Sequence, residues 1–287
     1  MKKTTLLRQY LQEKKILVAP GVFDGLSALL AKEAGFEVLY ASGGAIARSA
    51  GYPDIGLLTM TEVCSVISHI VNISELPIIA DGDTGFGNAL NARRMARTYE
   101  QLGVAGLHIE DQTFPKRCGH LNDKTLISQE EMCHKIRVAR EALTDPDFVL
   151  IARTDAIAVE GFERAITRAQ AYQKAGADMI FVEAPETVEQ IQVIAQQIKG
   201  PKLINMFYGG KTPLVPVEKL QEWGYSIAII PSDLQRAAIK AMQNTLKTIA
   251  RDGNSGAVAE TLTSFNEREL IVGTEQYFAI DKVIDLC

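Results

Sequence analysis

The sequence predicts an α/β protein with the (β/α)8 architecture of a TIM barrel. First, eight short apolar or β-branched runs recur along the chain, and each is followed by an amphipathic stretch with helical periodicity. Second, these runs are apolar almost throughout, as parallel strands buried on both faces must be. Third, a chain of 287 residues with 47% hydrophobic content can bury the core of one large α/β domain.

The strand candidates follow one another in a regular order. An open doubly wound sheet is the alternative fold, but it usually has fewer strands and a glycine-rich phosphate turn after the first, which APGVFDG does not supply. Glycines that suit left-handed helix ends precede several strands, at Gly35, Gly103, Gly176 and Gly224. The strand candidates are ILVAP from Ile16, VLYAS from Val38, PIIAD from Pro77, LHIED from Leu107, VLIART from Val149, MIFVE from Met179, KLIN from Lys202 and SIAII from Ser226.

The last part of the chain lies beyond the eighth predicted barrel helix. We expect a barrel domain over residues 1–253 and a C-terminal helical extension over residues 254–287. The extension is too apolar for a free tail, so it needs a surface to pack against, either on its own barrel or on another subunit. Its apolar residues are Val258, Leu262, Phe265, Leu270, Ile271, Tyr277, Phe278 and Ile280.

Composition and cysteine spacing narrow the class of protein. The net charge of −5 does not predict nucleic-acid binding. The basic start MKKTTLLRQYLQEKK lacks the apolar stretch of a signal peptide, and no run approaches the length of a membrane span. We therefore expect a cytoplasmic enzyme. Four cysteines without CxxC spacing fit a reducing compartment and argue against a zinc site; they are Cys64, Cys118, Cys133 and Cys287.

The segment FPKRCGHL surrounds one thiol with cationic side chains. It contains, consecutively, Lys116, Arg117, Cys118, Gly119 and His120. Positive charges favour the thiolate and lower the pKa of a cysteine below its free value of about 8.5. The glycine leaves the backbone open to a closely approaching anion. The segment predicts a cysteine that exchanges a proton near neutral pH, the alternative being a solvated basic loop that happens to contain a cysteine.

Carboxylates gather at the ends of two neighbouring strand candidates. IIADGDTGFG places Asp81 and Asp83 two residues apart, and LHIED ends in Glu110 and Asp111. Because residues two apart in a strand point to the same side, Asp81 and Asp83 are expected to converge. Clustered carboxylates repel one another unless a cation lies among them, and oxygen ligands suit Mg²⁺ or Mn²⁺. We predict a metal site at Asp81, Asp83 and Glu110, with Asp54 of GYPDIG either a fourth ligand or a turn former.

Polar residues follow most of the predicted strands at their C-terminal ends, where the active sites of such barrels lie. Structural polar residues would instead scatter between the two ends of the barrel. Arg153 and Glu183 have an alternative explanation as a structural ion pair, with Asp155 as a further partner of the arginine. The polar residues at the strand ends are Tyr40, Ser42, Asp81, Asp83, Glu110, Arg153, Glu183 and Asn205.

These residues carry a resemblance to the isocitrate lyase/phosphoenolpyruvate mutase superfamily that spans residues 20–278. The matching motifs are APGVFDGLSALL, YASGGA, GYPDIGL, ADGDTGFG, GLHIEDQ, PKRCGH, ARTDAIAVEGFERAITRAQAY, KAGADMIFVEA and NMFYGGKTPL. PKRCGH and ARTDAIAVEG resemble the 2-methylisocitrate lyases. NMFYGGKTPL is more similar to the lyases of substituted malates, such as 2,3-dimethylmalate lyase and the petal death protein, because methylisocitrate enzymes usually have threonine where Phe207 stands.

The resemblance implies a carbon–carbon lyase with bound Mg²⁺, or Mn²⁺ in its place. The substrate would be a 2-hydroxy dicarboxylate or tricarboxylate, and the products pyruvate or another 2-oxo acid and a carboxylic acid such as succinate. The implied catalytic residues are Cys118 as the general acid, Lys116 and His120 as stabilising cations, and Tyr40 as a proton acceptor. The implied substrate-binding residues are Ser42, Gly43, Gly44, Arg117, Gly119, Arg153, Glu183 and Asn205. Exchange of a C-terminal helix between the subunits of a homotetramer is also implied.

Other functions remain open at this stage. An oxaloacetate hydrolase or decarboxylase would share the metal and the 2-oxo-acid pocket, but hydrolases of this superfamily tend to carry serine where Pro231 stands. Phosphonomutase chemistry is disfavoured by the intact KRCGH segment, since that branch lacks the cysteine. A catalytically silent dicarboxylate-binding protein would be expected to have lost the thiol or a metal ligand, and this chain keeps both.

Overall fold

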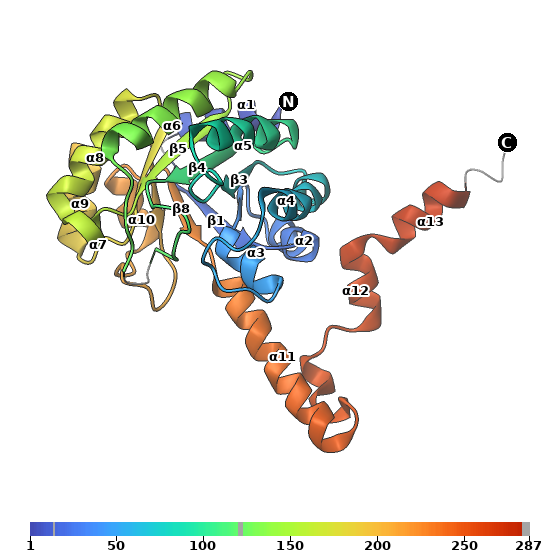
Figure 1. Ribbon diagram of the computed structural model, residues 1–287. Coiled ribbons are helices and arrows are strands. Elements are labelled where there is room, and N and C mark those ends of the chain that lie inside the picture. The colour runs from blue at the N-terminus through green and yellow to red at the C-terminus, as the bar shows by residue number, and fades with distance from the viewer. Residues whose placement is uncertain (14, 120–122, 283–287) are drawn as a thin grey trace. The chain divides into compact units, whose positions relative to one another are not determined.

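The computed structural model describes residues 1–13, 15–119 and 123–282 and confirms the predicted barrel. In this part of the chain, eight parallel strands pair in sequence order, and β8 pairs with β1 to close the barrel (Figure 1). The strands are β1 (Leu17–Val22), β2 (Leu39–Ala41), β3 (Ile78–Asp81), β4 (Gly106–Glu110), β5 (Val149–Thr154), β6 (Met179–Val182), β7 (Lys202–Asn205) and β8 (Ile227–Ile230).

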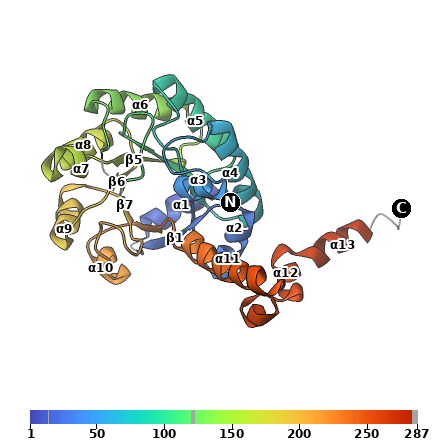
Figure 2. The ribbon, with the colours of Figure 1, turned by 60° about the horizontal axis from the view of Figure 1, so that its bottom comes forward.

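Helices surround the strands, as Figure 2 shows. The helix ends that the glycines predict are confirmed, because Gly35, Gly103, Gly176 and Gly224 all have positive φ. The helices of the barrel are α1 (Lys3–Gln12), α2 (Gly25–Glu33), α3 (Gly43–Ser49), α4 (Met60–Ser74), α5 (Ala89–Gln101), α6 (Gln129–Ala142), α7 (Ile157–Glu160), α8 (Phe162–Lys174), α9 (Val188–Gln197) and α10 (Val217–Glu222).

Alternation along the strands divides the apolar residues into two clusters. In β5, Val149 and Ile151 belong to one cluster, whereas Leu150 and Ala152 belong to the other. The first cluster draws on strands all round the barrel and fills its interior, while the second lies between the strands and the helices. Leu7 of α1 is fully buried in the interior cluster. The N-terminal end of the barrel is therefore packed with apolar side chains, which leaves the C-terminal end for a site.

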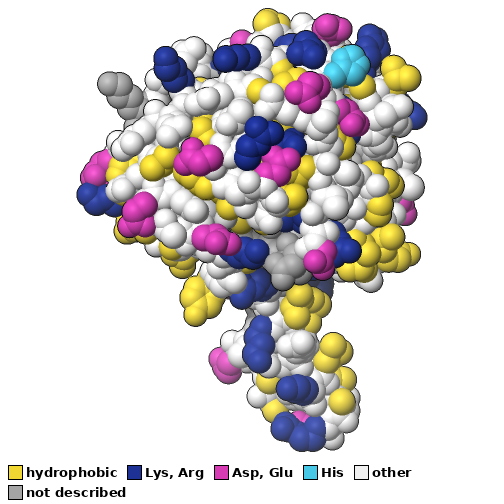
Figure 3. Space-filling model, turned by 60° about the vertical axis from the view of Figure 1, so that its left-hand side comes forward, with side chains coloured by type: hydrophobic (Ala, Val, Ile, Leu, Met, Phe, Trp, Pro, Cys, Tyr) yellow, Lys and Arg dark blue, Asp and Glu magenta, His cyan; other side chains and the backbone are white. Residues whose placement is uncertain are grey.

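The C-terminal part of the chain, from residue 234 onward, forms a compact unit separate from that of residues 1–233. The boundary that the sequence predicts at residue 253 stays a prediction. Between Gly256 and Lys282 no helix buries a residue. Figure 3 shows one face of the molecule, on which hydrophobic side chains lie among charged ones. No described helix has both the length and the apolar character needed to cross a membrane. The helices of this part are α11 (Asp233–Asp252), the 3-10 helix η1 (Gly256–Thr261), α12 (Phe265–Val272) and α13 (Thr274–Lys282).

Truncation of a leucine inside the barrel should destabilise the protein far more than truncation of one on its surface. Leu203 of β7 is 1% exposed in the interior cluster, and Leu90 of α5 is 76% exposed. We expect Leu203→Ala to lower the free energy of unfolding by about 2–5 kcal/mol, because a cavity replaces the side chain. Leu90→Ala should change it by less than about 0.5 kcal/mol. Urea unfolding followed by circular dichroism measures both, and equal effects would contradict the assignment of Leu203 to the interior.

Candidate active site

The inward-facing rows of the strands become polar at their C-terminal ends. In β5, Arg153 continues the row of Val149 and Ile151. Because all the strands are parallel, the polar ends of these rows meet at one mouth of the barrel. Each of these residues is at most 8% exposed: Tyr40, Asp81, His108, Glu110, Arg153, Glu183 and Asn205. The structure thus brings together six of the polar strand-end residues that the sequence singles out, Tyr40, Asp81, Glu110, Arg153, Glu183 and Asn205, and adds His108 to them.

Asp81 and Asp83 do lie together, but for a different reason from the one expected. β3 ends at Asp81, and Asp83 has φ of 46°, so it does not continue the strand and the alternation argument is wrong. Instead the chain turns, and the backbone N–H of Asp83 donates a hydrogen bond of 3.0 Å to Oδ1 of Asp81. The turn itself therefore brings the second carboxylate back toward the first.

Lys116 lies among the carboxylates that the sequence proposes as metal ligands. Its Nζ is 2.5 Å from Oδ1 of Asp54 and 2.7 Å from Oδ1 of Asp83. The side chain is 5% exposed, and burial alone would lower its pKa, but Asp83 and Asp54 raise the pKa well above its ordinary value. Lys116 is therefore a buried, permanently charged cation that joins the thiol segment to the carboxylates.

Two glycines at the start of α3 allow the carboxylates to approach its backbone. A Cβ on Gly43 would lie 2.7 Å from Oδ2 of Asp81, and one on Gly44 would lie 2.7 Å from Oδ2 of Asp54. Ser42 caps the same helix, since its Oγ accepts from the backbone N–H of Ala45 at 3.4 Å. The predicted oxo-acid-binding residues therefore lie beside the predicted metal ligands.

The mouth carries more carboxylate charge than its buried cations neutralise. Burial, together with Asp81 and Asp54, raises the pKa of Asp83 to about 6 although Lys116 opposes the shift. Burial also raises the pKa of Glu110 well above its ordinary value, even with Arg153 at 3.2 Å. Both oxygens of Glu110 are buried and accept no hydrogen bond from the described residues. Such oxygens are suited to a bound cation or its water ligands.

The carboxylates fit Mg²⁺ held mainly through water. Within the described ranges, no three His, Cys, Asp or Glu side chains converge closely enough to serve as a ready set of direct ligands. Mg²⁺ usually keeps several of its waters and binds proteins through one or two carboxylates. An all-oxygen set of acidic side chains therefore matches Mg²⁺ better than a metal that needs a closed set of protein ligands.

The ion pairs offered as an alternative for Arg153 are present. Its guanidinium donates to Asp155 from Nε at 2.9 Å and from Nη2 at 3.0 Å, and Nε lies 3.9 Å from Oε2 of Glu183. Asn205 donates to Oε1 of Glu183 at 3.3 Å. These contacts fix the guanidinium at the mouth. The same contacts are compatible with a role of Arg153 in substrate binding, because a guanidinium held in one orientation can bind a substrate carboxylate.

Tyr40 forms a buried pair with His108, a residue that the sequence analysis did not single out. The Tyr40 hydroxyl is 2.8 Å from Nε2 of His108 and 3.2 Å from Oδ2 of Asp81. Burial lowers the pKa of His108, so the ring is neutral at pH 7, and its Nδ1 has no hydrogen-bond partner among the described residues. A buried N–H is costlier to leave unpaired than a lone pair, which assigns the proton to Nε2. Tyr40 then accepts from His108 and donates to Asp81.

The thiol segment reaches the mouth through its backbone. Cys118 is half-buried, and a Cβ on Gly119 would lie 2.7 Å from Oε1 of Glu183. The side chain of Arg117 is 48% exposed and pairs with Asp123 at 3.5 Å. Its predicted role in substrate binding stays a prediction. His120 lies outside the described residues.

Several residues that support the site were missed by the sequence analysis. His108 stands two residues before Glu110 in β4, so the alternation rule would have placed it in the mouth. Gln112 and Lys124 carry no such signal, because they lie outside the strands. All three contact the residues proposed for catalysis or their segment.

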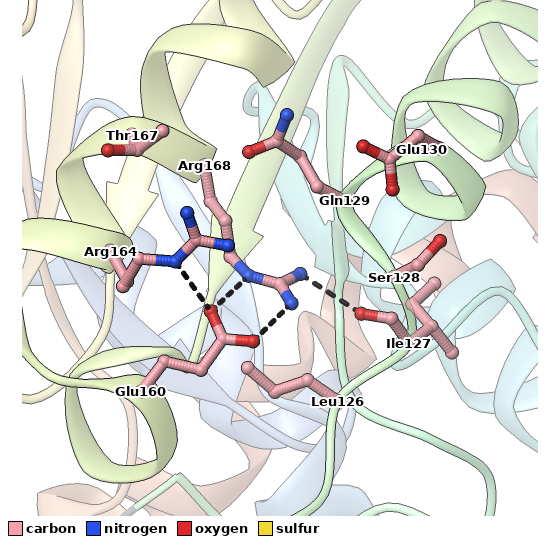
Figure 4. A pocket seen from close by; sticks show the side chains of 9 residues that line it. All are labelled: Leu126, Ile127, Ser128, Gln129, Glu130, Glu160, Arg164, Thr167 and Arg168. Carbon is pink, nitrogen blue, oxygen red and sulfur yellow. Dashed lines mark hydrogen bonds and ion pairs between the residues drawn. The ribbon is translucent and has the colours of Figure 1, made fainter.

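A further hydrogen-bond network, centred on Asp111, supports Asp155 and through it Arg153. Oδ2 of Asp111 accepts from Tyr172 and Thr154 at 2.7 Å, and its Oδ1 accepts from the backbone N–H of Asp155 at 2.9 Å. Arg168 lies 3.4 Å from the same Oδ2 and pairs with Glu160 at the edge of a cleft of about 570 Å³ (Figure 4). Arg168, which lines this cleft, already pairs with Asp111 and Glu160. We therefore interpret the cleft as a surface feature next to this structural network and not as a ligand site.

Fold and site together define a (β/α)8-barrel enzyme whose active site opens at the carboxyl ends of the strands. The family model described as phosphoenolpyruvate phosphomutase matches residues 7–250. The chain therefore belongs to this family, within the PEP mutase/isocitrate lyase superfamily.

Relatives in this family include lyases. The chain is 43% identical to a 2-methylisocitrate lyase of Aeropyrum pernix, over 95% of this chain and 88% of that protein. It is 41% identical to a 2,3-dimethylmalate lyase of Eubacterium barkeri, over 96% of each. A crystal structure of 2,3-dimethylmalate lyase matches with a TM-score of 0.93 at 35% identity, covering 99% of this chain and 96% of that one.

Solved structures of other activities match nearly as well. An oxaloacetate acetylhydrolase bound to 3,3-difluorooxalacetate has a TM-score of 0.93 at 33% identity, with 99% and 97% of the two chains covered. A phosphonopyruvate hydrolase solved with oxalate and Mg²⁺ has a TM-score of 0.89 at 32% identity, with 98% and 99% covered. The barrel backbone therefore does not by itself distinguish these reactions.

Neutralising Asp83 should stabilise the metal-free protein increasingly as the pH rises. In the folded state the carboxyl keeps its proton up to about pH 6, whereas its unperturbed pKa is 3.8. Between these values folding takes up a proton, so this group lowers stability as the pH rises through the window. In EDTA, the unfolding temperature of Asp83→Asn relative to wild type should therefore increase from pH 4 to pH 7. Asp123→Asn, at a side chain that is 86% exposed, is the control and should show no such trend. A flat difference for Asp83→Asn would contradict the raised pKa.

Proposed function

We propose that the protein is a Mg²⁺-dependent carbon–carbon lyase that cleaves a 2-hydroxy dicarboxylate or tricarboxylate. 2-Methylisocitrate and 2,3-substituted malates are the proposed substrates, and pyruvate and a carboxylic acid such as succinate the products. The observation that carries the proposal is the position of the KRCG segment. Lys116 pairs with two carboxylates of the mouth, while Gly119 packs against Glu183. The identity of 43% and 41% to two lyases supports the same reaction class.

Substrate binding is assigned to residues that already face the mouth. Mg²⁺, held by Asp81, Asp83, Glu110 and Asp54, would supply the positive charge that acidifies the 2-hydroxyl group of the substrate. The backbone N–H groups of Gly43 and Gly44, at the start of α3, would bind the carboxylate of the 2-oxo-acid product. They lie next to Ser42, whose own backbone N–H already donates to the carbonyl of Val22 at 3.1 Å. Glu183 and Asn205 would contact the part of the substrate that leaves as the second acid.

Bond cleavage needs a proton acceptor and a place for negative charge. Tyr40 is the proposed acceptor for the hydroxyl proton. Because burial and Asp81 raise the pKa of Tyr40 well above its ordinary value, the phenol would take up that proton only as its own proton passes to Oδ2 of Asp81, 3.2 Å away, while Nε2–H of His108 donates to the phenol oxygen at 2.8 Å. As the ketone forms at C2, the C2–C3 bond breaks and its electron pair stays on C3. The carboxylate beside C3 shares this charge, and the fixed cations Lys116 and Arg153 would stabilise it, with His120 as a third proposed cation.

Cys118 is proposed as the group that completes the reaction. Its thiol would donate a proton to C3, so the carbanion becomes the saturated acid and the cysteine becomes a thiolate. The thiolate then recovers a proton before the next turnover. Arg117 and Gly119, on either side of the thiol, are proposed to bind the substrate. This assignment separates the two proton transfers, with Tyr40 acting at the oxygen on C2 and Cys118 acting at C3.

An oxaloacetate hydrolase or decarboxylase is the second candidate, and phosphonomutase-type chemistry on a carbon–phosphorus bond is a third. The specific observation in favour of the second is the TM-score of 0.93 to an oxaloacetate acetylhydrolase, equal to that of the lyase structure. Pro231, which follows β8, favours the lyase, because the hydrolases of the superfamily tend to carry serine there. The candidates make different products and are therefore separated by assay.

The function is tested by measuring product release from purified protein. We expect pyruvate from 2-methylisocitrate or 2,3-dimethylmalate in the presence of Mg²⁺, and none in excess EDTA until Mg²⁺ or Mn²⁺ is restored. If the protein instead releases oxalate and acetate from oxaloacetate, and no pyruvate from 2-methylisocitrate or 2,3-dimethylmalate, the hydrolase proposal would replace the lyase proposal. Full turnover in EDTA by protein that contains no metal would refute the metal requirement.

The same assay tests the role of the thiol. Cys118→Ser keeps the size of the side chain but raises the pKa of the proton donor, so turnover should fall by roughly 10²–10⁴-fold while binding changes little. Cys64→Ser, in α4, is the matched control and should retain wild-type turnover. Near wild-type turnover by Cys118→Ser would show that another group protonates C3.

We also propose that the protein acts in the cytoplasm. Its relatives are metabolic lyases, and the proposed mechanism requires a reduced thiol. Cys64, Cys118 and Cys133 form no disulfide in the described part of the chain, which supports a reducing compartment.

A homotetramer with exchanged C-terminal segments is the proposed assembly. The support comes from residues 253–282, in which several large apolar side chains are exposed. Monomeric proteins rarely expose apolar side chains grouped in this way. Phe265 is 69% exposed, Leu270 76% and Ile280 68%. Burial of these side chains against another subunit would remove them from water and stabilise the assembly.

Charges placed on this apolar surface should dissociate the assembly. We expect the wild type to have the mass of a tetramer in light scattering, and Leu270→Asp with Phe278→Asp to reduce that mass, because burial of unpaired carboxylates is unfavourable. Leu90→Asp, at a site 76% exposed on α5, is the control and should remain tetrameric. A monomeric wild type would overturn the proposed assembly.

A further inference from the structure

Lys124 is a buried lysine whose ammonium group joins the thiol segment to the site arginine. Its Nζ donates to the carbonyl oxygen of Gly119 at 2.5 Å and to Oδ1 of Asp155 at 2.9 Å. The whole residue is 6% exposed. A lysine is rarely buried unless it is paired, and here one partner is the backbone of the residue that follows Cys118.

Asp155 is shared between Lys124 and Arg153. The guanidinium of Arg153 donates to both carboxylate oxygens of Asp155, and the ammonium of Lys124 donates to one of them. Burial alone would raise the pKa of Asp155, but Arg153 and Lys124 lower it below its ordinary value, so the carboxylate is ionised. The backbone N–H of Asp155 is held in turn by Asp111. One fixed carboxylate therefore orients the site arginine and the end of the thiol segment together.

The other side of Cys118 is also fixed. The side-chain amide of Gln112, 1% exposed, donates to the carbonyl of Arg117 at 2.8 Å and accepts from its N–H at 2.9 Å. Cys118 is thus bracketed by two hydrogen bonds between Gln112 and the backbone of residue 117 and by one from Lys124 to the carbonyl of residue 119. Of these three contacts, only that of Lys124 involves a charged group and leads to the arginine.

We propose that Lys124 is a positioning residue that sets the place of the Cys118 thiol relative to Arg153. Its ammonium fixes the carbonyl of Gly119 to Asp155, and so the thiol and the guanidinium keep one geometry. The effect on turnover rests on the proposed lyase function, but the effect on the position of the thiol does not. Hydrogen bonds to charged groups are stronger than those between neutral groups, so these two contacts can hold a short segment in one position.

The first test measures the reactivity of Cys118 in the full-length protein without ligand. Lys124→Met keeps the length of the side chain and removes both donated hydrogen bonds. We expect iodoacetamide to alkylate Cys118 at least about tenfold faster in this variant, because loss of a charge-assisted hydrogen bond raises the population of the released segment by that order. Peptide mass spectrometry resolves Cys118 from Cys64, whose alkylation rate should not change.

Lys202→Met is the matched control. Lys202 is also a buried lysine, 5% exposed, and donates to the backbone carbonyls of Ile198 and Gly200 at 3.2 and 2.9 Å. It stands at the first residue of β7, at the opposite end of the strand from the mouth. This variant should lose stability without faster alkylation of Cys118. Alkylation of Cys118 that is unchanged in Lys124→Met, slower, or accelerated equally in Lys202→Met would overturn the proposal.

The second test measures turnover. Lys124→Met should lower kcat with little change in KM, and Lys124→Arg, which keeps the charge, should restore part of it. A fall in kcat without faster alkylation would contradict positioning of the thiol. If Lys124→Met does not fold, as judged by circular dichroism, Lys124→Gln serves in both tests. If the wild type cleaves none of the proposed acids, the lyase proposal fails, whereas the alkylation comparison still decides the role of Lys124.

Discussion

Repulsion among buried carboxylates is the constraint on which the mouth of the barrel depends. Asp83 and Glu110 both have raised pKa values, caused first by burial. The cations that relieve the repulsion are themselves held by further carboxylates, since Lys116 pairs with Asp54 and Arg153 with Asp155. Each of these cations is therefore neutralised in part by a carboxylate of its own. An acidic excess remains that a divalent ion can remove at the point where substrate binds, which couples binding of the metal to stability of the site.

Alternation along the strands explains how much of the structure could be predicted. The run VLIART buries Val149 and Ile151 inside the barrel and places Arg153 next in the same row. The two-residue alternation of side chains along a strand thus determines both the core and the ring of polar residues. The eight strands begin within one residue of the expected positions. The same rule would have included His108, which lies in the row of Glu110.

The contacts that could not be predicted lie where the backbone has no period. Asp83 turns back in a left-handed conformation, which no alternation rule describes. Lys124 meets Asp155 across 31 residues, and its other partner is a backbone carbonyl that carries no mark in the sequence. The path of a loop depends on the closed barrel beneath it, so the partners of loop side chains become known only once the tertiary structure is built.

The choice of reaction must reside in these loops. A lyase and an oxaloacetate acetylhydrolase match this barrel with the same TM-score, although they break bonds in different ways. Hydrolysis of oxaloacetate needs a water molecule that adds to C2 before the C2–C3 bond breaks, whereas the lyase forms the ketone at C2 from the hydroxyl group of its substrate. In both reactions C3 takes up a proton. The packing of Gly119 against Glu183 leaves no room there even for a Cβ, so the backbone beside the thiol closes the wall next to Arg153. A loop packed this closely against the site can favour cleavage over hydrolysis without any change in the strands, because its position decides whether a water molecule fits beside the reacting carbon.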